Sequence, residues 1–365
     1  MTPLQRSMEL TDALNRALNG CEGSDVRTAP NCLCWVKLDC AQPSGSFKIR
    51  GIGHLAQTAL QSGVTRLCSS SGGNAGMATA YAASACGSEM SATVVVPTTT
   101  PEFARNKIRA LGAEVIVHGD VWDEADKRVR EIVAEAGGGK ACYVPPFEHP
   151  TIWEGHASMV DEIKVQMGGA VPDVICVSVG GGGLLCGVLI GLQRNGWEDV
   201  HVVAVETKGA HSFAAAMDAG MPVSLPGGIT SIAKSLGATT ASASAVRMSK
   251  EHPGGVTPVV VSDAAAVRAC CLFADDHRCL VEPACGAALA GAAYDRDGVL
   301  AGVAKVVCAN GLLTTAVHTA GEANGKAPAQ KAGGIHHVVV IACGGNIVSR
   351  RMLDEWSAQL KSKGD

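Results

Sequence analysis

The chain has 365 residues, of which 47% are hydrophobic and 18% are charged, and its formal net charge is -4. This length is enough for two domains with a large buried core. No basic excess is present, so nucleic-acid binding is not expected, because phosphate backbones are held by clustered lysine and arginine.

The apolar stretches are too short or too interrupted to span a membrane. Residues 93–96 and 338–343 are far shorter than a transmembrane helix, and residues 184–192 contain two glycines. The first ten residues mix charged with apolar side chains and lack the apolar core of a signal peptide. The sequence therefore predicts a soluble, cytoplasmic protein without a membrane partner.

The 15 cysteines predict reduced thiols rather than disulfides or zinc ligands. Their number is odd, none are spaced Cys-x-x-Cys, and most lie in apolar runs, as Cys176, Cys186 and Cys308 do. We expect them to act mainly as small, buried hydrophobic side chains.

Strand, glycine turn and helix alternate along the chain, and such βαβ units build parallel sheets. In chain order, the predicted elements are helix 49–60, strand 67–68, helix 74–85, strand 92–96, a helix capped by Thr100 and ended by Gly112, strand 114–117, strand 174–179, helix 184–194, strand 202–205 and strand 338–342. Three prolines within residues 143–150 mark a connection between two sheet-forming regions. Residues 321–334 are polar and predict an exposed loop or a poorly ordered insertion.

Lys48 is the first candidate for chemistry. It follows a Pro-Ser-Gly-Ser turn and opens the helix predicted over residues 49–60. The positive end of a helix dipole favours a neutral amine, which is the form that reacts with carbonyl groups. A lone lysine is usually a solvated surface group, so this pattern alone makes Lys48 only a candidate.

Two loops that precede predicted helices are candidate anion sites. The first, residues 70–76, reads Ser-Ser-Gly-Gly-Asn-Ala-Gly, and the second, residues 180–183, is four glycines. Free backbone amides at a helix start bind anions, and glycine lets a ligand approach the backbone closely. An ordinary capped helix start explains the first loop equally well.

The four-glycine loop is neither a P-loop nor a dinucleotide-binding fingerprint. No Gly-Lys-Ser/Thr follows it, and Leu185 and Cys186 stand where a third glycine would be required. Glu206 nevertheless ends the next predicted strand, where an NAD-dependent dehydrogenase places the acid that binds ribose. A dehydrogenase is therefore one alternative.

Residues 41–51 read Ala-Gln-Pro-Ser-Gly-Ser-Phe-Lys-Ile-Arg-Gly and resemble the cofactor-lysine motif of the mammalian-type serine dehydratases. These are fold-type-II pyridoxal-phosphate enzymes of the tryptophan synthase β-like group. Further segments resemble the same family in order: residues 153–158, 178–187, 206–213, 229–237, 281–290 and 343–345. The resemblance covers nearly the whole chain, and it departs at Gly72 and at the extra residues near 321–334.

The resemblance implies the fold, the activity and the cofactors. Two open, twisted, mostly parallel sheets flanked by helices would form a large pyridoxal-phosphate-binding domain, residues 1–40 plus 143–365, and a small domain, residues 41–142. The enzyme would convert L-serine to pyruvate and ammonia, and L-threonine to 2-oxobutanoate and ammonia. It would be a homodimer that uses pyridoxal 5'-phosphate and a monovalent cation such as potassium.

The resemblance also assigns roles to individual residues. Lys48 would carry the cofactor and remove the substrate α-proton, Phe47 would flank the pyridine ring, and Cys343 would lie beside the ring nitrogen. The cofactor phosphate would be bound by Gly180, Gly181, Gly182, Gly183 and Leu184. The substrate would be bound by Ser71, Gly72, Asn74 and Ala75. The cation would be bound by Glu206 with backbone groups near Ala210, Leu236 and Ala238. Asn74 would also lie near the phenolic oxygen of the cofactor.

Three alternatives stay open besides the dehydrogenase: a serine racemase, a β-replacing cysteine synthase and a non-catalytic binding protein. In similar racemases a serine occupies the position of Gly72. Racemisation needs a second acid–base group, which glycine cannot supply. We therefore expect little racemase activity.

Overall fold

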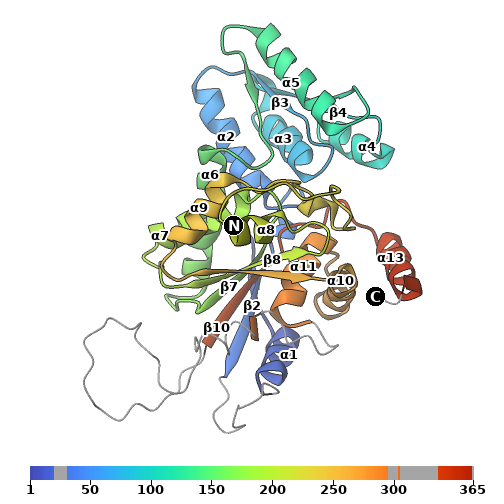
Figure 1. Ribbon diagram of the computed structural model, residues 1–365. Coiled ribbons are helices and arrows are strands. Elements are labelled where there is room, and N and C mark those ends of the chain that lie inside the picture. The colour runs from blue at the N-terminus through green and yellow to red at the C-terminus, as the bar shows by residue number, and fades with distance from the viewer. Residues whose placement is uncertain (20–30, 295–302, 305–335, 364–365) are drawn as a thin grey trace.

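The computed structural model describes residues 1–19, 31–294, 303–304 and 336–363 (Figure 1). It contains two β-sheets, with strand orders β1-β2-β10-β7-β8-β9 and β5-β4-β3-β6. The strands are β1 (Leu4–Ser7), β2 (Cys32–Lys37), β3 (Arg66–Ser69), β4 (Ser91–Val96), β5 (Glu114–Val117), β6 (Ala141–Tyr143), β7 (Val174–Ser178), β8 (His201–Thr207), β9 (Val256–Val261) and β10 (His336–Ile341).

All strand pairs are parallel except β1 with β2, which is antiparallel. β7 and β8 are buried along their whole length and are rich in valine. Continuous apolar strands of this kind are typical of parallel sheets that are covered on both faces. The two mostly parallel sheets confirm the predicted α/β fold.

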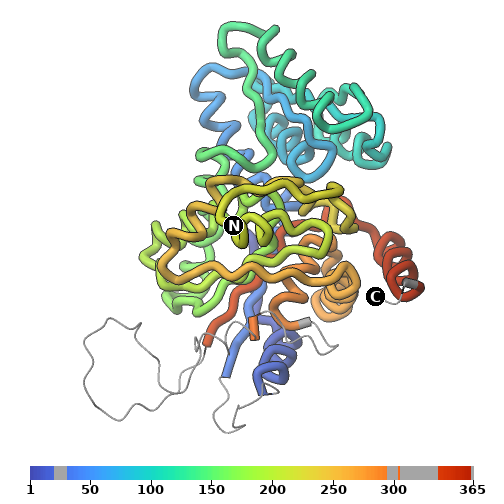
Figure 2. Tube along the Cα trace, in the orientation of Figure 1, coloured from blue at the N-terminus to red at the C-terminus, as the bar shows by residue number. Residues whose placement is uncertain are grey.

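Helices surround both sheets. They are α1 (Met8–Asn19), η1 (Asp39–Ala41), α2 (Lys48–Gln61), α3 (Asn74–Ala85), η2 (Gly87–Glu89), α4 (Glu102–Ala110), α5 (Trp122–Ala136), α6 (Pro150–Gln166), α7 (Gly183–Arg194), α8 (Ser212–Ala219), η3 (Lys234–Leu236), α9 (Ala243–Glu251), α10 (Asp263–His277), α11 (Pro283–Leu289), η4 (Ala290–Tyr294) and α13 (Arg350–Lys363). Helices α2 to α5 lie around the smaller sheet at the top of Figure 1. The tube in Figure 2 shows the same upper body formed by blue to green chain, with both chain ends in the lower body.

The strands of the smaller sheet all lie within residues 66–143. The division into residues 41–142 and residues 1–40 plus 143–365 nevertheless stays a prediction. The expected cap of α4 is wrong: Pro101, not Thr100, precedes the helix, and no side chain caps it. Pro101 has extended backbone angles, so the helix begins only at Glu102. The loop predicted at residues 321–334 lies outside the described residues, and so does Cys308.

Among the described residues, no helix combines the length and the apolar character that a membrane crossing requires. Many cysteines in the same part of the chain are thiols buried in the core, as Cys34, Cys176 and Cys186 are. They pack there as small hydrophobic side chains.

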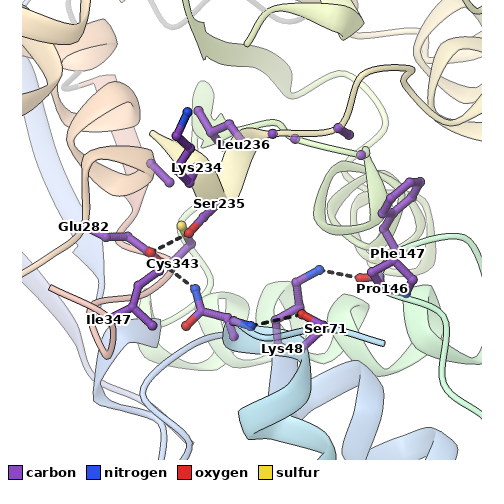
Figure 3. A pocket seen from close by; sticks show the side chains of 18 of the residues that line it. Lys48, Ser71, Pro146, Phe147, Lys234, Ser235, Leu236, Glu282, Cys343 and Ile347 are labelled. Atoms are coloured by element: carbon purple, nitrogen blue, oxygen red, sulfur yellow. Dashed lines mark hydrogen bonds between the residues drawn. The ribbon is translucent and has the colours of Figure 1, made fainter. Parts of the chain in front are cut away.

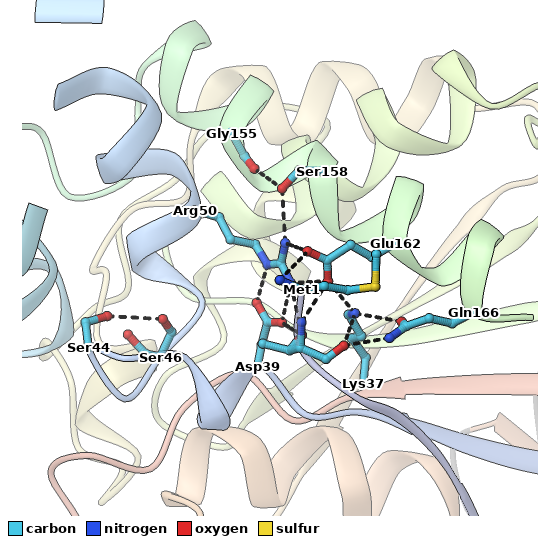
Figure 4. Close-up of polar contacts among 11 residues, drawn as sticks. Met1, Lys37, Asp39, Ser44, Ser46, Arg50, Gly155, Ser158, Glu162 and Gln166 are labelled. Carbon is cyan, nitrogen blue, oxygen red and sulfur yellow. Dashed lines mark hydrogen bonds and ion pairs between the residues drawn. The ribbon is translucent and has the colours of Figure 1, made fainter. Parts of the chain in front are cut away.

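A buried network of charged side chains joins α2 to the larger sheet and to α6 (Figure 4). Arg50, in the first turn of α2, donates to both carboxylate oxygens of Asp39, at 2.7 and 2.8 Å, and to those of Glu162, at 2.9 and 2.7 Å. The Lys37 amine, at the end of β2, donates to Glu162 at 2.5 Å. Burial opposes the charged form of Glu162, but the hydrogen bonds from Arg50 and Lys37 outweigh it and lower its pKa to about 2. The network therefore fixes the start of α2, two residues from Lys48.

Candidate active site

A cavity of about 730 Å³ opens at the carboxyl ends of strands from both sheets (Figure 3). Its wall includes Ser71, shortly after β3, Ser178, at the end of β7, and Cys343, shortly after β10. Open parallel sheets bind their ligands at this edge, where the loops between strands and helices diverge. The expected cofactor and substrate residues all line this one cavity: Phe47, Lys48, Ser71, Gly72, Asn74, Ala75, Gly180, Gly181, Gly182, Gly183, Leu184 and Cys343.

Lys48 is the first residue of α2, and its amine donates a hydrogen bond to the carbonyl of Pro146 at 2.5 Å. The side chain as a whole is partly exposed to the cavity, but its amine is removed from bulk water. This desolvation lowers the pKa of Lys48 to about 8, and the negative charges that Cys343 and Glu282 can carry oppose the shift. The amine is therefore neutral much more often than that of a surface lysine, chiefly because of desolvation.

The four-glycine turn between β7 and α7 leaves no room for side chains. A Cβ atom on Gly182 would lie 2.5 Å from the Cβ of Ala245, and one on Gly181 would overlap the ring of Phe147. Gly182 also has a φ of +99°, which side-chain-bearing residues rarely adopt. Because α7 begins at Gly183, the amides of its first turn have no partner within the helix. The turn is thus a backbone cradle suited to a phosphate group.

A second helix start, that of α3, faces the same cavity through Ser71, Gly72, Asn74 and Ala75. The Ser71 hydroxyl accepts a hydrogen bond from the amide of Gly73 at 3.3 Å. The Asn74 amide nitrogen donates to Glu282 at 2.7 Å, whereas its carbonyl oxygen is buried without a partner among the described residues. Such an orphaned acceptor is costly unless a ligand donates to it.

Phe47 and Cys343 meet at the base of the cavity, where the Phe47 amide donates to the Cys343 carbonyl at 2.8 Å. The Phe47 ring packs on His156, with ring centroids 4.9 Å apart. The Cys343 sulfur lies 3.3 Å from the Ser178 hydroxyl and 3.1 Å from the sulfur of Cys285. Both residues line the cavity in which a pyridine ring would bind. The contacts of Phe47 with the ring face and of Cys343 with the ring nitrogen stay predictions.

The expected cation ligands come from two segments of the chain. Leu236 and Ala238 line the cavity, whereas Glu206 and Ala210 lie around the end of β8. The Glu206 carboxylate is buried and accepts hydrogen bonds from the amides of Phe213 and Ala214, at 2.9 and 2.7 Å. Burial raises the pKa of Glu206 to about 8 despite these two bonds. The cation itself stays a prediction.

Two residues of the wall were not singled out by the sequence pattern. Glu282 is a buried acid that contacts Asn74 and Ser235, and Phe147 packs against the glycine cradle. Glu282 stands before Pro283 at the start of α11, and this Glu-Pro pair before a small-residue helix is the one local feature that points to it.

Comparisons with known proteins agree with this geometry. Residues 22–310 match the family described as "Pyridoxal-phosphate dependent enzyme". A human relative named "L-serine dehydratase/L-threonine deaminase" is 45% identical over 326 residues, which cover 89% of either chain. The solved structure of a fungal L-serine ammonia-lyase from Rhizomucor miehei has a TM-score of 0.77 at 33% identity and covers 98% of both chains. Maize serine racemase has a TM-score of 0.73 at 21% identity, covers 100% of this chain and 94% of its own, and shares the fold alone.

This chain belongs to the family of pyridoxal-phosphate dependent enzymes. Within that family its relatives include proteins named serine dehydratase, so the predicted resemblance and the fold-type-II class are confirmed. The same membership argues against the NAD-dependent dehydrogenase.

The residues present fit the cofactor. The glycine cradle suits its phosphate and the Lys48 amine suits its aldehyde. In the same cavity, the unpartnered oxygen of Asn74 can accept a hydrogen bond from a ligand. A volume of about 730 Å³ holds both the cofactor and a small amino acid.

Proposed function

We propose that this chain is an L-serine ammonia-lyase that converts L-serine to pyruvate and ammonia, and L-threonine to 2-oxobutanoate and ammonia. The observation that carries the proposal is the Lys48 amine, with a pKa of about 8, in the same cavity wall as a phosphate cradle and a helix start suited to a carboxylate. The names of the human and fungal relatives support this substrate class.

Pyridoxal phosphate, when bound, supplies an electron-accepting ring that delocalises the negative charge left on the substrate Cα. The chain holds and orients it: the amides of the glycine cradle would bind the phosphate, and Phe47 would contact one face of the ring. Cys343 would face the ring nitrogen as a weak hydrogen-bond donor.

Lys48 supplies the base. Its neutral amine accepts the proton from Cα, and the low pKa keeps enough of that form available near neutral pH. The β-hydroxyl takes up one proton and leaves as water, which balances the proton that Lys48 removed from Cα. One water is then consumed when the released enamine, in its imine form, hydrolyses to the 2-oxo acid and ammonia.

The start of α3 holds the substrate. The amides and hydroxyl around Ser71, Asn74 and Ala75 would bind the carboxylate, where a helix N-terminus favours a negative charge. Gly72 offers no second acid–base group on this loop, so reprotonation of Cα from the face opposite Lys48 has no donor there. Elimination is therefore favoured over racemisation.

We also propose that Glu206, with backbone groups near Ala210, Leu236 and Ala238, holds a monovalent cation such as potassium. The buried Glu206 carboxylate contacts no cationic side chain in its hydrogen bonds within the described chain, and a bound cation would offset its charge. The family resemblance further supports a homodimer in the cytoplasm.

The test is product formation from L-serine by the purified, cofactor-loaded protein in potassium buffer. We expect pyruvate and ammonia in equal amounts, and D-serine at a much lower rate. A loaded protein that makes no pyruvate would exclude the lyase, and D-serine formed as fast as pyruvate would replace it with a racemase.

A further inference from the structure

Glu282 is an acid in the cavity wall with only 3% of its surface exposed. Each of its carboxylate oxygens accepts one hydrogen bond: Oε1 from the Asn74 amide nitrogen at 2.7 Å, and Oε2 from the Ser235 hydroxyl at 2.6 Å (Figure 3). Asn74 begins α3, beside the smaller sheet, whereas Ser235 lies in η3. The carboxylate therefore bridges α3 and η3, which approach the cavity from different parts of the chain.

The backbone holds this carboxylate in place. Glu282 immediately precedes α11, and its amide donates to the Gly344 carbonyl at 3.2 Å. Its own carbonyl accepts from the amides of Cys285 and Gly286, at 2.8 and 3.0 Å. A Cβ atom on Gly344 would lie 2.6 Å from Oε1, so the glycine leaves the space that the carboxylate fills.

Burial of an acid at this position is costly. Burial raises the pKa of Glu282, and the hydrogen bonds from Ser235 and Asn74, with the charge of Lys48, oppose that rise. Neither hydrogen-bonding partner carries a charge, so the carboxylate is not stabilised by a contacting ion pair. Acids with pKa values raised in this way cluster at functional sites.

The orientation of Asn74 is what the carboxylate controls. A side-chain amide carries a donor end and an acceptor end of nearly the same shape. Both oxygens of the Glu282 carboxylate accept hydrogen bonds in the structure, so the carboxylate faces the NH₂ end of Asn74 and leaves the unpartnered oxygen for a ligand.

We propose that Glu282 is a positioning residue that fixes the Asn74 amide for cofactor and substrate and ties it to the loop containing Ser235. The inference rests on the proposed function of the cavity. Glu282 acts through Asn74 and takes no part in the bond-making steps.

The test is a double-mutant cycle on the full-length protein, with wild type, Glu282→Gln, Asn74→Ala and the double variant. The apoprotein of each is titrated with pyridoxal phosphate to give the cofactor Kd, and the KM and kcat for L-serine are measured on loaded protein. We expect Glu282→Gln to raise the cofactor Kd and the KM about tenfold, with a smaller change in kcat. In the Asn74→Ala background the same change should have almost no effect, because its target is gone.

Ser235→Ala provides a second double-mutant cycle with a smaller perturbation, because it removes only the hydrogen bond from Ser235 to the Glu282 carboxylate. Its effect on Kd should be smaller than that of Glu282→Gln and should also vanish in the Asn74→Ala background. This cycle decides the question if Glu282→Gln does not fold. Glu251, which forms an exposed ion pair with Arg247, offers a matched control. Glu251→Gln should leave the cofactor Kd and the KM unchanged.

The inference would be overturned if Glu282→Gln changed the cofactor Kd equally in the wild-type and the Asn74→Ala backgrounds. It would also be overturned if Glu282→Gln left the cofactor Kd of the wild type unchanged. These results leave the lyase proposal intact, since wild type would still bind the cofactor and make pyruvate. A wild type that does neither would overturn the proposed function first.

Discussion

At the start of α2, the Lys48 amine donates to the Pro146 carbonyl and lies in the cavity wall. Desolvation is the largest influence on its pKa, which falls from the ordinary 10.5 to about 8. For a base this means that the neutral form dominates above pH 8 rather than above pH 10.5, because burial penalises the charged form.

The pH dependence of cofactor attachment follows from this shift. The rate at which pyridoxal phosphate attaches to the apoprotein should rise with pH and level off above a midpoint of about 8. Stopped-flow absorbance of the lysine-bound cofactor measures this rate. A rate that keeps rising towards pH 10.5 would mean that the Lys48 amine is solvated like that of a surface lysine.

The glycine cradle gives a second prediction at this scale. Gly181→Ala introduces a Cβ that overlaps the Phe147 ring, so the turn must move and its amides no longer converge. We expect the cofactor Kd to rise about tenfold or more, which corresponds to the free energy of one charge-assisted hydrogen bond. Gly53→Ala in α2 is the control, because its Cβ would lie 3.7 Å from the nearest side chain. Equal Kd values for the two variants would place the phosphate elsewhere.

Site residues differ in how far the sequence reveals them. Lys48 and the glycines at 180–183 are recognisable because a helix start and a glycine run are local patterns. Glu282 and Phe147 are not, because their contacts are made only in the folded chain: Glu282 and Asn74 are 208 residues apart. No local pattern reports a contact of that separation.

At the scale of elements, the same limit applies to strands. Strands β4, β5 and β7 follow from local apolar runs that are bounded by turns, and their observed bounds agree with the predicted ones within a residue. Strand β9 is not among the predicted elements, and Pro258 interrupts its apolar run. The proline is tolerated since β9 is the last strand of its sheet. Strand order depends on long-range packing, so it was not predicted either.

The network around Arg50 couples α2 to its surroundings, and its loss should destabilise the whole fold. Arg50→Gln leaves the buried carboxylates of Asp39 and Glu162 without their shared partner, which should lower the free energy of unfolding by about 3 kcal/mol. Arg247→Gln removes an exposed pair with Glu251 and should cost less than about 0.5 kcal/mol. Urea unfolding of both variants measures the difference.

The same network makes the free energy of unfolding fall at acid pH. The pKa of Glu162 is lowered from 4.5 to about 2, so its contribution to stability is complete above pH 4.5 and is lost as the pH falls towards 2. Arg50→Gln should reduce this loss on the acid side. Similar unfolding curves for Arg50→Gln and Arg247→Gln at pH 7 would show that the network is energetically unimportant.

For the whole molecule, a bound cation should appear as stability. Potassium chloride should raise the Tm by about 2 °C over tetramethylammonium chloride of equal ionic strength, because a ligand of the folded state stabilises it. Glu206→Gln removes the buried carboxylate that would hold the cation, so its Tm should be the same in both salts. Equal Tm values for the wild type in the two salts would contradict the cation site.

Lys48 is the residue that we expect to carry the cofactor, in a cavity bounded by both sheets. The direct measurement is borohydride reduction of the yellow protein, followed by peptide mass spectrometry to find the pyridoxyl group. We expect the pyridoxyl group on Lys48, its loss in Lys48→Ala, and its retention in Lys234→Ala, which changes another lysine of the cavity wall. A pyridoxyl group on any other lysine of the wild type would contradict this assignment.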